Sequence, residues 1–488
     1  MKKYVSLLIV LLLSSQLYAQ DLPILKAALT SLHPGIERYG TPAQVDSLFT
    51  ALELGTRKPL SQAQYYILLS QAITHIRCGH TYLNYWNQDK AIKEALYSKT
   101  VPPVLFRLIG RKMIITHNLS RSPLVKPGDE VLSINGSPIK GIVDSLLTVS
   151  PSDGQHGLPR KLDNISIEPL DADTANYNLF DIYFPLFFPK NFNTTTYVLK
   201  MKRQAGNIYT VTVPSLTKAG RLQAYNTKFG KLPVHESNWS LRFLNPATAV
   251  FKIGDFETWE WKADYHKYLD SIFTLLKQRD VKNLIIDIRG NGGGDDEARD
   301  EVFSYLTAQP FGCEDPMHRR FRFLSVPDTL LPYLKTWNKS FKDPKDPADY
   351  VKVAAGDWES KKEMAQACEP IKPKAGRFKG RMFLLTDGRN ASTTFTMAKL
   401  FRTYHAGEIV GEPTGGNQQG INGGQFFFLY LPVSKIEIDI PLVWGAYPGN
   451  RPDTGIVPDK LVPVTVPSIS RNADPALSYV LKEIAAAK

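Results

Sequence analysis

Residues 282–294 read KNLIIDIRGNGGG and place a continuously apolar run directly before a glycine-rich turn. The pattern recurs in residues 381–398, RMFLLTDGRNASTTFTMA, where apolar residues at helical spacing follow the turn. Apolar runs that do not alternate and that are separated by helices are typical of parallel strands buried on both faces. Together with ATAVFKIG at residues 247–254 and GEIVGEPTGG at residues 407–416, they predict an α/β core within residues 216–488.

The glycine-rich turn, Gly290 to Gly294, lies between a predicted strand and a predicted helix. Its backbone amides therefore point into a cleft at the carboxyl end of the strand. The turn lacks the GxGxxG spacing of a dinucleotide site and the lysine of a phosphate loop. Amides fixed on a rigid strand end suit an oxyanion, whose charge develops only in the transition state. A tight turn without a chemical role is the alternative.

Ser392 opens the helix that is predicted to follow the second turn. A serine in this position commonly caps the helix N-terminus through its hydroxyl. The same position places the hydroxyl beside a helix N-terminus, which favours negative charge, and beside the amide of Thr393, which is a suitable oxyanion donor. From this stretch alone, a helix cap and a nucleophile are equally good accounts of Ser392.

The first half of the chain has different patterns. Helical spacing within residues 21–75 predicts a small helical cap, placed at residues 20–100, and TYLNYW at residues 81–86 alternates like a strand. Residues 101–215 are β-rich, and the turn, strand, hairpin turn and helix in residues 127–147, PGDEVLSINGSPIKGIVDSLL, resemble a PDZ domain. PDZ domains bind an extended peptide as an added strand. Some other β-hairpin and helix is the alternative.

Residues 1–19 have the pattern of a secretory signal peptide, with two lysines before an apolar run and a polar stretch that ends at Ala19. We therefore expect an exported protein, periplasmic or extracellular, without a membrane-spanning segment after signal removal. A buried N-terminal helix is the alternative reading of these residues. In an oxidising compartment, Cys313 and Cys368 form the better disulfide pair, because they flank one stretch rich in Pro, Lys and Asp.

Composition narrows the range of partners. The formal net charge is +12, but lysines and arginines are scattered and no basic run is interleaved with aromatic residues. We therefore expect no nucleic-acid partner. The three cysteines have no zinc-site spacing, and we expect neither a metal nor a cofactor.

The ordered set of motifs resembles the C-terminal processing or tail-specific peptidases of serine peptidase family S41. This family includes the tricorn core protein and the interphotoreceptor retinoid-binding protein repeats. The motifs are a PDZ-like region, then GNGGG, TDGRNAS, IVGEPTGG and, at residues 454–459, TGIVPD. The resemblance implies a crotonase/ClpP-like βαβ core and an oxyanion held by amides of the glycine-rich turn and of Thr393. Many members have proline, which has no amide hydrogen, where this chain has Gly292, so the first amide is assigned to Gly293.

One departure from the family decides the general base. The processing peptidases pair their serine with a lysine after the GE-T-G turn, where this chain has Asn417 and Gln418. Lys399 lies two helical turns beyond Ser392, too far to replace it. The tricorn-like branch instead uses a histidine from the N-terminal part, and this implies His80 as the base.

Two neighbours of the implied base stay open. Cys78 stands where many relatives have Asp in an Asp-Gly-His-Thr turn. The acid that would orient the histidine is assigned to Asp453, two residues before Gly455, although turn chemistry explains Asp453 equally well. Asp459 and Glu412 are the alternatives.

The sequence therefore predicts an exported serine endopeptidase that cleaves peptides or unfolded proteins through an acyl-enzyme, with no cofactor. Ser392, His80 and Asp453 are the catalytic residues, and Gly293 and Thr393 supply the oxyanion amides. A non-catalytic peptide- or ligand-binding protein on the same fold and an esterase with the same triad are the competing hypotheses.

Overall fold

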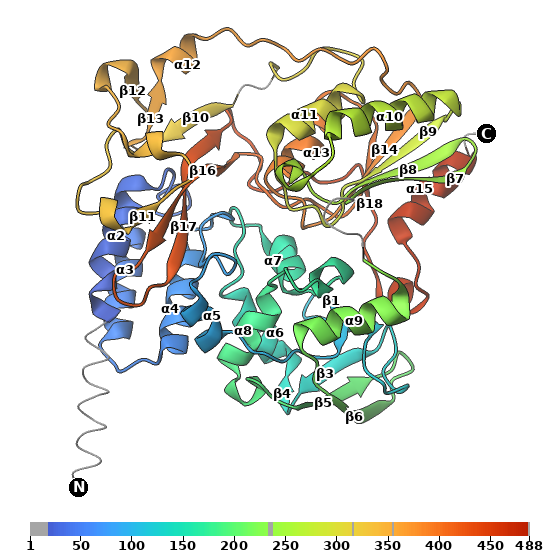
Figure 1. The fold of residues 1–488 in the computed structure, drawn as a ribbon, viewed down its shortest axis with the longest axis horizontal. Coiled ribbons are helices and arrows are strands. Elements are labelled where there is room, and N and C mark those ends of the chain that lie inside the picture. The colour runs from blue at the N-terminus through green and yellow to red at the C-terminus, as the bar shows by residue number, and fades with distance from the viewer. Residues whose placement is uncertain (1–17, 233–237, 315–316, 354–355, 487–488) are drawn as a thin grey trace.

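The structure is a computed structural model that describes residues 18–232, 238–314, 317–353 and 356–486. Three six-stranded sheets organise these residues, with helices packed around them (Figure 1). Residues 1–17 of the predicted signal peptide lie outside the described part of the chain. Within that part, no helix has both the length and the apolar character needed to cross a bilayer.

The parallel sheet predicted for the second half is present, with strand order β18-β15-β14-β9-β8-β7. All its pairs are parallel except that of β7 with β8. Its strands are β7 Trp239–Asn245, β8 Thr248–Ile253, β9 Asn283–Asp287, β14 Arg381–Thr386, β15 Glu408–Gly411 and β18 Lys460–Leu461. Because β9 and β14 are neighbours, the turns that follow them meet at one edge of the sheet.

Helices cover both faces of this sheet, which explains why its strands are apolar without alternation. Leu284 and Ile286 of β9 share a core with residues of α10, α11 and α13, whereas Ile285 shares a core with residues of α15. The helices of this half are α10 Tyr265–Gln278, α11 Asp296–Ser304, α13 Thr393–Thr403, α14 Val466–Ser470 and α15 Pro475–Ala486, with the short η4 Thr258–Glu260.

A second, antiparallel sheet contains the turns predicted in residues 127–147. Gly128, in the turn before β3, has φ 87°. Asn135 and Gly136 have φ 48° and 77°, and at these two residues the chain turns so that β4 pairs with β3, with Ile134 opposite Ser137. The strands are β1 Val104–Ile109, β2 Lys112–Asn118, β3 Glu130–Ile134, β4 Ser137–Pro138, β5 Thr196–Lys202 and β6 Ile208–Pro214. The accompanying helices are α6 Ile139–Leu147, α7 Leu158–Ile165, η1 Pro169–Ala172, α8 Leu179–Phe187, η2 Pro189–Asn191 and α9 Lys218–Phe229. The strands and the helix predicted here are confirmed.

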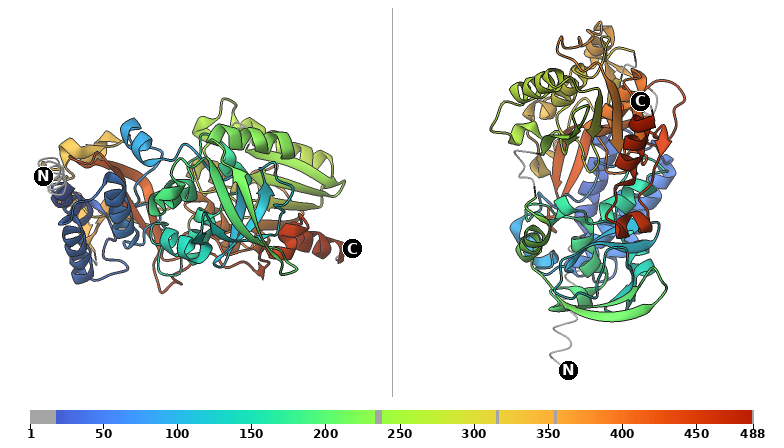
Figure 2. Two further views of the ribbon diagram at one scale, coloured as in Figure 1. Left: turned by 90° about the horizontal axis from the view of Figure 1, so that it is seen from below. Right: turned by 90° about the vertical axis from the view of Figure 1, so that its right-hand side faces the viewer.

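A third sheet, which the sequence did not suggest, packs against the predicted helical cap. Phe427 and Ile438 of this sheet share one apolar core with Leu25 and Tyr65 of the cap. The cap helices are α2 Asp21–Leu32, α3 Pro42–Thr56 and α4 Gln62–Thr74. The strands, in sheet order, are β11 Leu334–Lys335, β16 Gly420–Tyr430, β17 Glu437–Ala446, β10 His318–Phe321, β13 Trp358–Ser360 and β12 Tyr350–Lys352. Figure 2 shows the cap and α15 at opposite ends of the molecule.

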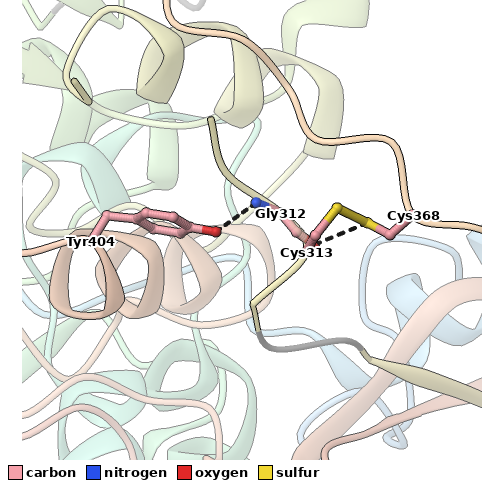
Figure 3. The surroundings of a disulfide bond; sticks show 4 residues. All are labelled: Gly312, Cys313, Cys368 and Tyr404. Carbon is pink, nitrogen blue, oxygen red and sulfur yellow. Dashed lines mark hydrogen bonds between the residues drawn. A yellow bond between two sulfur atoms is a disulfide. The ribbon is translucent and has the colours of Figure 1, made fainter. Parts of the chain in front are cut away.

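The insertion that carries four strands of the third sheet is closed by a disulfide. Cys313 and Cys368 are bonded, with their Cα atoms 5.8 Å apart (Figure 3), which confirms the pairing expected from the sequence. The amide of Gly312 donates to the hydroxyl of Tyr404, the residue that follows α13, at 2.7 Å (Figure 3). The insertion is therefore attached at this point to the helix that Ser392 precedes. Its short helices are η5 Leu331–Tyr333, η6 Lys339–Lys342, η7 Pro347–Asp349 and α12 Lys361–Ala365.

The strand predicted for residues 81–86 was wrong. The segment is irregular and is followed by α5, Lys90–Leu96. The side chain of Asn84 accepts a hydrogen bond from the amide of Trp86 and bends the chain. A single backbone bond, from the amide of Asp439 to the carbonyl of Tyr82, joins this segment to β17. The alternation of TYLNYW therefore reflects side chains that are buried around a turn.

Candidate active site

Ser392 occupies the N-cap position of α13 without capping it. Its side chain makes no cap hydrogen bond, and its backbone has φ 52° and ψ −131°. A positive φ in a residue other than glycine costs about 1–3 kcal/mol and is found preferentially at functional sites. The side chain is half-buried, so its hydroxyl is free of the cap and partly accessible. A strained serine between a strand and a helix is also the arrangement that exposes the nucleophile in other serine hydrolases.

Hydrogen bonds join the turn of Ser392 to the glycine-rich turn. The amide of Gly290 donates to Asp387 Oδ2 at 2.9 Å, and Asn390 Nδ2 donates to the carbonyl of Asn291 at 3.2 Å. Thr394 Oγ1 donates to Asn291 Oδ1. The two turns therefore form one rigid unit at the carboxyl ends of β9 and β14.

Gly293 lies directly against Ser392. Its φ is 132°, and a Cβ atom added there would lie 2.8 Å from Ser392 Cβ and 3.3 Å from Ser392 Oγ. The amide of Gly293 donates to Asn291 Oδ1 at 2.9 Å, so this amide reaches an oxyanion only by sharing or releasing that bond. The amide of Thr393 is the first of α13 and has no acceptor within the helix.

His80 lies over β16, far from Ser392 in the sequence. A Cβ atom added at Gly423 would lie 3.9 Å from Cε1 and Nε2 of His80, and the ring of Phe426 is 6.0 Å away between centroids. His80 Nδ1 is buried and has no hydrogen-bond partner among the described residues. Burial lowers the pKa of His80, the carboxylate of Asp153 opposes this change, and the guanidinium of Arg160 adds to it.

The turn that carries His80 is bound to the turn of Asp153. The amide of Gly79 donates to Asp153 Oδ1 at 2.8 Å, and the amide of Gly154 donates to the carbonyl of Arg77 at 3.0 Å. Asp153 is thus the carboxylate that acts on His80, and sequence reasoning missed it. The available signal was the PSDG turn at residues 151–154, within the polar stretch that interrupts the PDZ-like region.

The three carboxylates considered from the sequence are engaged elsewhere. Asp453 accepts from Asn417 Nδ2 and from the amide of Gln155. Glu412 pairs with Arg107, and Asp459 accepts from the amide of Ile409 at 2.8 Å. Asp453 still lies near the site, because a Cβ atom added at Gly154 would lie within 4 Å of it.

Arg160 connects the two sides of the site. Its guanidinium donates to the carbonyl of Arg389, three residues before Ser392, and its charge acts on His80. No hydrogen bond joins His80 to Ser392 in the residues that the structure describes. Hydrogen bonds between a catalytic base and a nucleophile are often long in the free enzyme and shorten in the enzyme–substrate complex.

The thiol of Cys78, next to this turn, is free and buried. Burial, with the charge of Asp153 adding to it, raises the pKa of the thiol to about 12. The thiol therefore stays protonated at neutral pH, and a thiol is a far weaker nucleophile than a thiolate. This argues against Cys78 as the reactive group.

A pocket of about 290 Å³ adjoins the glycine-rich turn. Arginines, acidic residues, asparagines and apolar residues line it together with two glycines of the turn. They include Arg160, Arg389, Asp171, Tyr85, Trp86, Gly290 and Gly292. The pocket offers room for a substrate segment next to the glycine-rich turn.

A serine freed from capping, a second turn bonded to its own, and a distant histidine over a neighbouring sheet are features of a serine hydrolase site. Residues 247–426 match the model of peptidase family S41. This part of the chain belongs to peptidase family S41. No curated protein matches the chain.

The fold of nearly the whole chain is similar to that of solved structures. A structure of mature CPAF complexed with lactacystin is 16% identical, with a TM-score of 0.61 over 97% of this chain and 98% of the other. A crystal structure of mature CPAF is 15% identical, with a TM-score of 0.60 over 97% of each chain. The photosystem II D1 C-terminal processing protease is 12% identical, with a TM-score of 0.41 over 95% and 98%.

Proposed function

We propose that the protein is an exported serine endopeptidase of the C-terminal processing type, with Ser392 as its nucleophile. The observation that carries this proposal is the conformation of Ser392, which has a strained backbone and a hydroxyl that does not cap α13. Membership of a peptidase family makes peptides or proteins the substrate class. The proposal includes a crotonase/ClpP-like core around the parallel sheet.

In the proposed reaction, Ser392 Oγ attacks the carbonyl carbon of a peptide bond, and His80 accepts the hydroxyl proton. The tetrahedral oxyanion accepts hydrogen bonds from the amides of Thr393 and Gly293. Its collapse breaks the C–N bond, His80 returns the proton to the leaving amine, and an ester to Ser392 remains. Water then hydrolyses this acyl-enzyme with His80 again as the base.

Two carboxylates support His80 in this proposal. Asp453 is assigned by resemblance, whereas Asp153 is assigned because its carboxylate holds the amide of Gly79 next to His80. A carboxylate beside a catalytic histidine stabilises the imidazolium that forms during proton transfer. The two assignments predict different pH profiles for variants of Asp153 and Asp453.

Substitution of Ser392 with alanine tests the proposal. We expect Ser392→Ala to abolish hydrolysis of unfolded protein substrates and covalent labelling by a fluorophosphonate, with an unchanged circular dichroism spectrum. Ser478, exposed on α15, provides the matched control, Ser478→Ala, which should label as the wild type does. Unchanged hydrolysis in Ser392→Ala would contradict the proposal.

The same reagents separate the two competing functions. A wild-type protein that does not label would be a binding protein on this fold. A protein that labels, cleaves aryl esters and leaves peptides intact would be an esterase. Selection of substrate C-termini by the PDZ-like region is part of the proposal, and a peptide whose C-terminus is amidated should then be cleaved more slowly than its free acid.

The disulfide Cys313–Cys368 supports export, because structural disulfides persist in oxidising compartments. We expect the mature protein to begin at Gln20, after removal of residues 1–19. Mass spectrometry of the protein recovered from outside the cytoplasm checks this. A chain recovered there with Met1 retained would contradict signal cleavage.

A further inference from the structure

An exposed group of aromatic side chains lies on the outward face of β16. Along this strand Phe427 and Leu429 are buried, whereas Phe426 and Phe428 are only partly covered. The indole of Trp337 lies 5.5 Å from the ring of Phe426 and 5.1 Å from the ring of Phe428, between centroids. We call Trp337, Phe426 and Phe428 the aromatic shelf.

The aromatic shelf is partly exposed although it is made of large apolar side chains. Trp337 has 61% of its surface exposed. A contiguous exposed aromatic surface is unusual on a soluble protein and commonly marks a binding site, since aromatic side chains lose much contact with water when a partner covers them. The shelf therefore has the character of a surface that is covered during function.

The segment that carries Trp337 is held in place. β11 pairs with β16, with Leu334 opposite Leu429 and Lys335 opposite Phe428. Lys342 Nζ donates to the carbonyl of Leu334 at 2.6 Å, and the amide of Asn338 donates to Thr336 Oγ1 at 3.2 Å. These bonds on both sides of Trp337 hold the backbone that carries its indole, which lowers the entropic cost of binding.

The aromatic shelf begins at the proposed base. The ring of Phe426 is 6.0 Å from that of His80, and Gly423, on the same strand, lies beneath His80. Within the described residues, β11 pairs only with Phe428 and Leu429, so the edge of β16 from Gly423 to Phe426 has no strand partner on that side. An extended peptide whose scissile bond lies near His80 can therefore run along β16 with a side chain on the shelf.

We propose that the aromatic shelf is the subsite that binds a large apolar side chain of the peptide substrate, close to the scissile bond. This inference rests on the proposed peptidase function and adds the substrate class, peptides with a bulky aliphatic or aromatic residue beside the cleavage point. The pocket at the glycine-rich turn mixes two arginines and four acidic residues with apolar side chains. The shelf is the apolar surface at the side of His80.

Paired peptides test the shelf in the active enzyme. Two fluorogenic peptides that differ only in one residue near the cleavage site, Phe or Ser, give a ratio of kcat/KM values. We expect the wild type to prefer Phe, and Trp337→Ala and Phe428→Ala to lower the Phe-to-Ser ratio about tenfold each, because well-packed aromatic contacts carry much of the binding free energy. Phe229→Ala, which removes a half-exposed aromatic side chain of α9, is the control and should keep the wild-type ratio.

A binding measurement separates the shelf from the peptidase proposal. In the Ser392→Ala background, calorimetry gives the affinity for the uncleaved Phe peptide with and without Trp337→Ala. Weaker binding in the double variant supports the shelf even where the wild type fails to hydrolyse or label, and that failure would contradict only the peptidase proposal. Equal affinity with and without Trp337, or an equal Phe-to-Ser ratio in wild type and both shelf variants, overturns the shelf.

Discussion

The turn of Ser392 and the turn of His80 are held in different ways. Side chains of Asp387 and Asn390 bond the turn of Ser392 to the glycine-rich turn, within one parallel sheet. His80 comes from a turn attached through Asp153 and placed over β16 of the third sheet. The proposed nucleophile and oxyanion amides thus have a fixed mutual geometry, whereas the position of the proposed base depends on packing between separate parts of the fold.

Because the two turns are held differently, mutations at each should have different effects. A change at the Ser392 turn acts on the geometry of bond formation, because close contacts leave it no room to adjust. A change around His80 acts on charge and proton affinity, because the ring has one unpartnered buried nitrogen and two opposite charges, Asp153 and Arg160, acting on it. Variants on each side should therefore change different measured quantities.

Gly293→Ala tests the rigid side and should have the largest effect. The added Cβ atom would lie 2.8 Å from Ser392 Cβ, in a backbone conformation with φ 132° that disfavours alanine. We expect the rate of fluorophosphonate labelling to fall about 100-fold or more, as when an oxyanion donor is lost, and the free energy of unfolding to fall by about 1–3 kcal/mol.

Gly292→Ala is the matched control for that variant. A Cβ atom added at Gly292 has no heavy atom within 4 Å, so its free energy of unfolding should stay near that of the wild type. Chemical denaturation measures both variants. Equal losses of stability and labelling in the two variants would show that the contact between Gly293 and Ser392 does not constrain the site.

Asp153→Asn tests the side of His80, with an expected loss of about tenfold or more in kcat/KM at neutral pH. Asparagine keeps an oxygen acceptor for the amide of Gly79 but removes the charge. The carboxylate raises the pKa of His80, whereas burial and Arg160 lower it. Since only neutral His80 accepts the proton, the acid limb of kcat/KM should lie below the ordinary histidine range near pH 6.5 in the wild type and move to still lower pH in Asp153→Asn.

Asp453→Asn distinguishes the two carboxylates in the same experiment. Asp453 bonds Asn417 and the amide of Gln155, so its loss should lower activity without moving the acid limb. If Asp453→Asn moves the limb and Asp153→Asn leaves it in place, the acid assigned by resemblance is the one that acts on His80.

Local sequence patterns predicted one side of the site better than the other. The strands before both turns are apolar without alternation, and helix α13 begins at Thr393 as its spacing indicates. The two turns meet because the parallel neighbouring strands that precede them end at the same edge of the sheet, which is a general property of parallel sheets. Ser392 and the glycine-rich turn could therefore be paired from the sequence alone.

The surroundings of His80 depend on contacts between residues far apart in the chain. Asp153 reaches Gly79 across 74 residues of sequence, and no local pattern encodes that approach. The third sheet was missed because four of its strands are short and come from the distant insertion, and because β16 and β17 pair with a register shift between Gly423 and Phe426. The irregular segment at residues 81–86 was taken for a strand because turn burial and strand alternation look alike over six residues.

A buried pair of carboxyl groups next to the His80 segment gives the smallest predicted effect. Glu437 and Asp439 of β17 are almost fully buried, and Asn84 Nδ2 donates to Asp439 Oδ2 at 2.8 Å. Burial raises the pKa of both groups, and their mutual interaction raises that of Glu437 further. The folded state therefore keeps protons that the unfolded chain releases above about pH 4.

The contribution of this pair to the free energy of unfolding should therefore fall as pH rises from about 5 to 8, because the pair binds more protons in the folded state than in the unfolded state in that window. Glu437→Gln removes one titrating group and should reduce the slope, raising stability at pH 8 by about 1 kcal/mol relative to the wild type. Glu297→Gln, at an exposed carboxylate of α11 beside the Ser392 side, should leave the slope unchanged. Urea denaturation across this pH range gives the free energy of unfolding of all three proteins. If it depends on pH equally in Glu437→Gln and in the wild type, Glu437 does not contribute to the pH dependence of stability.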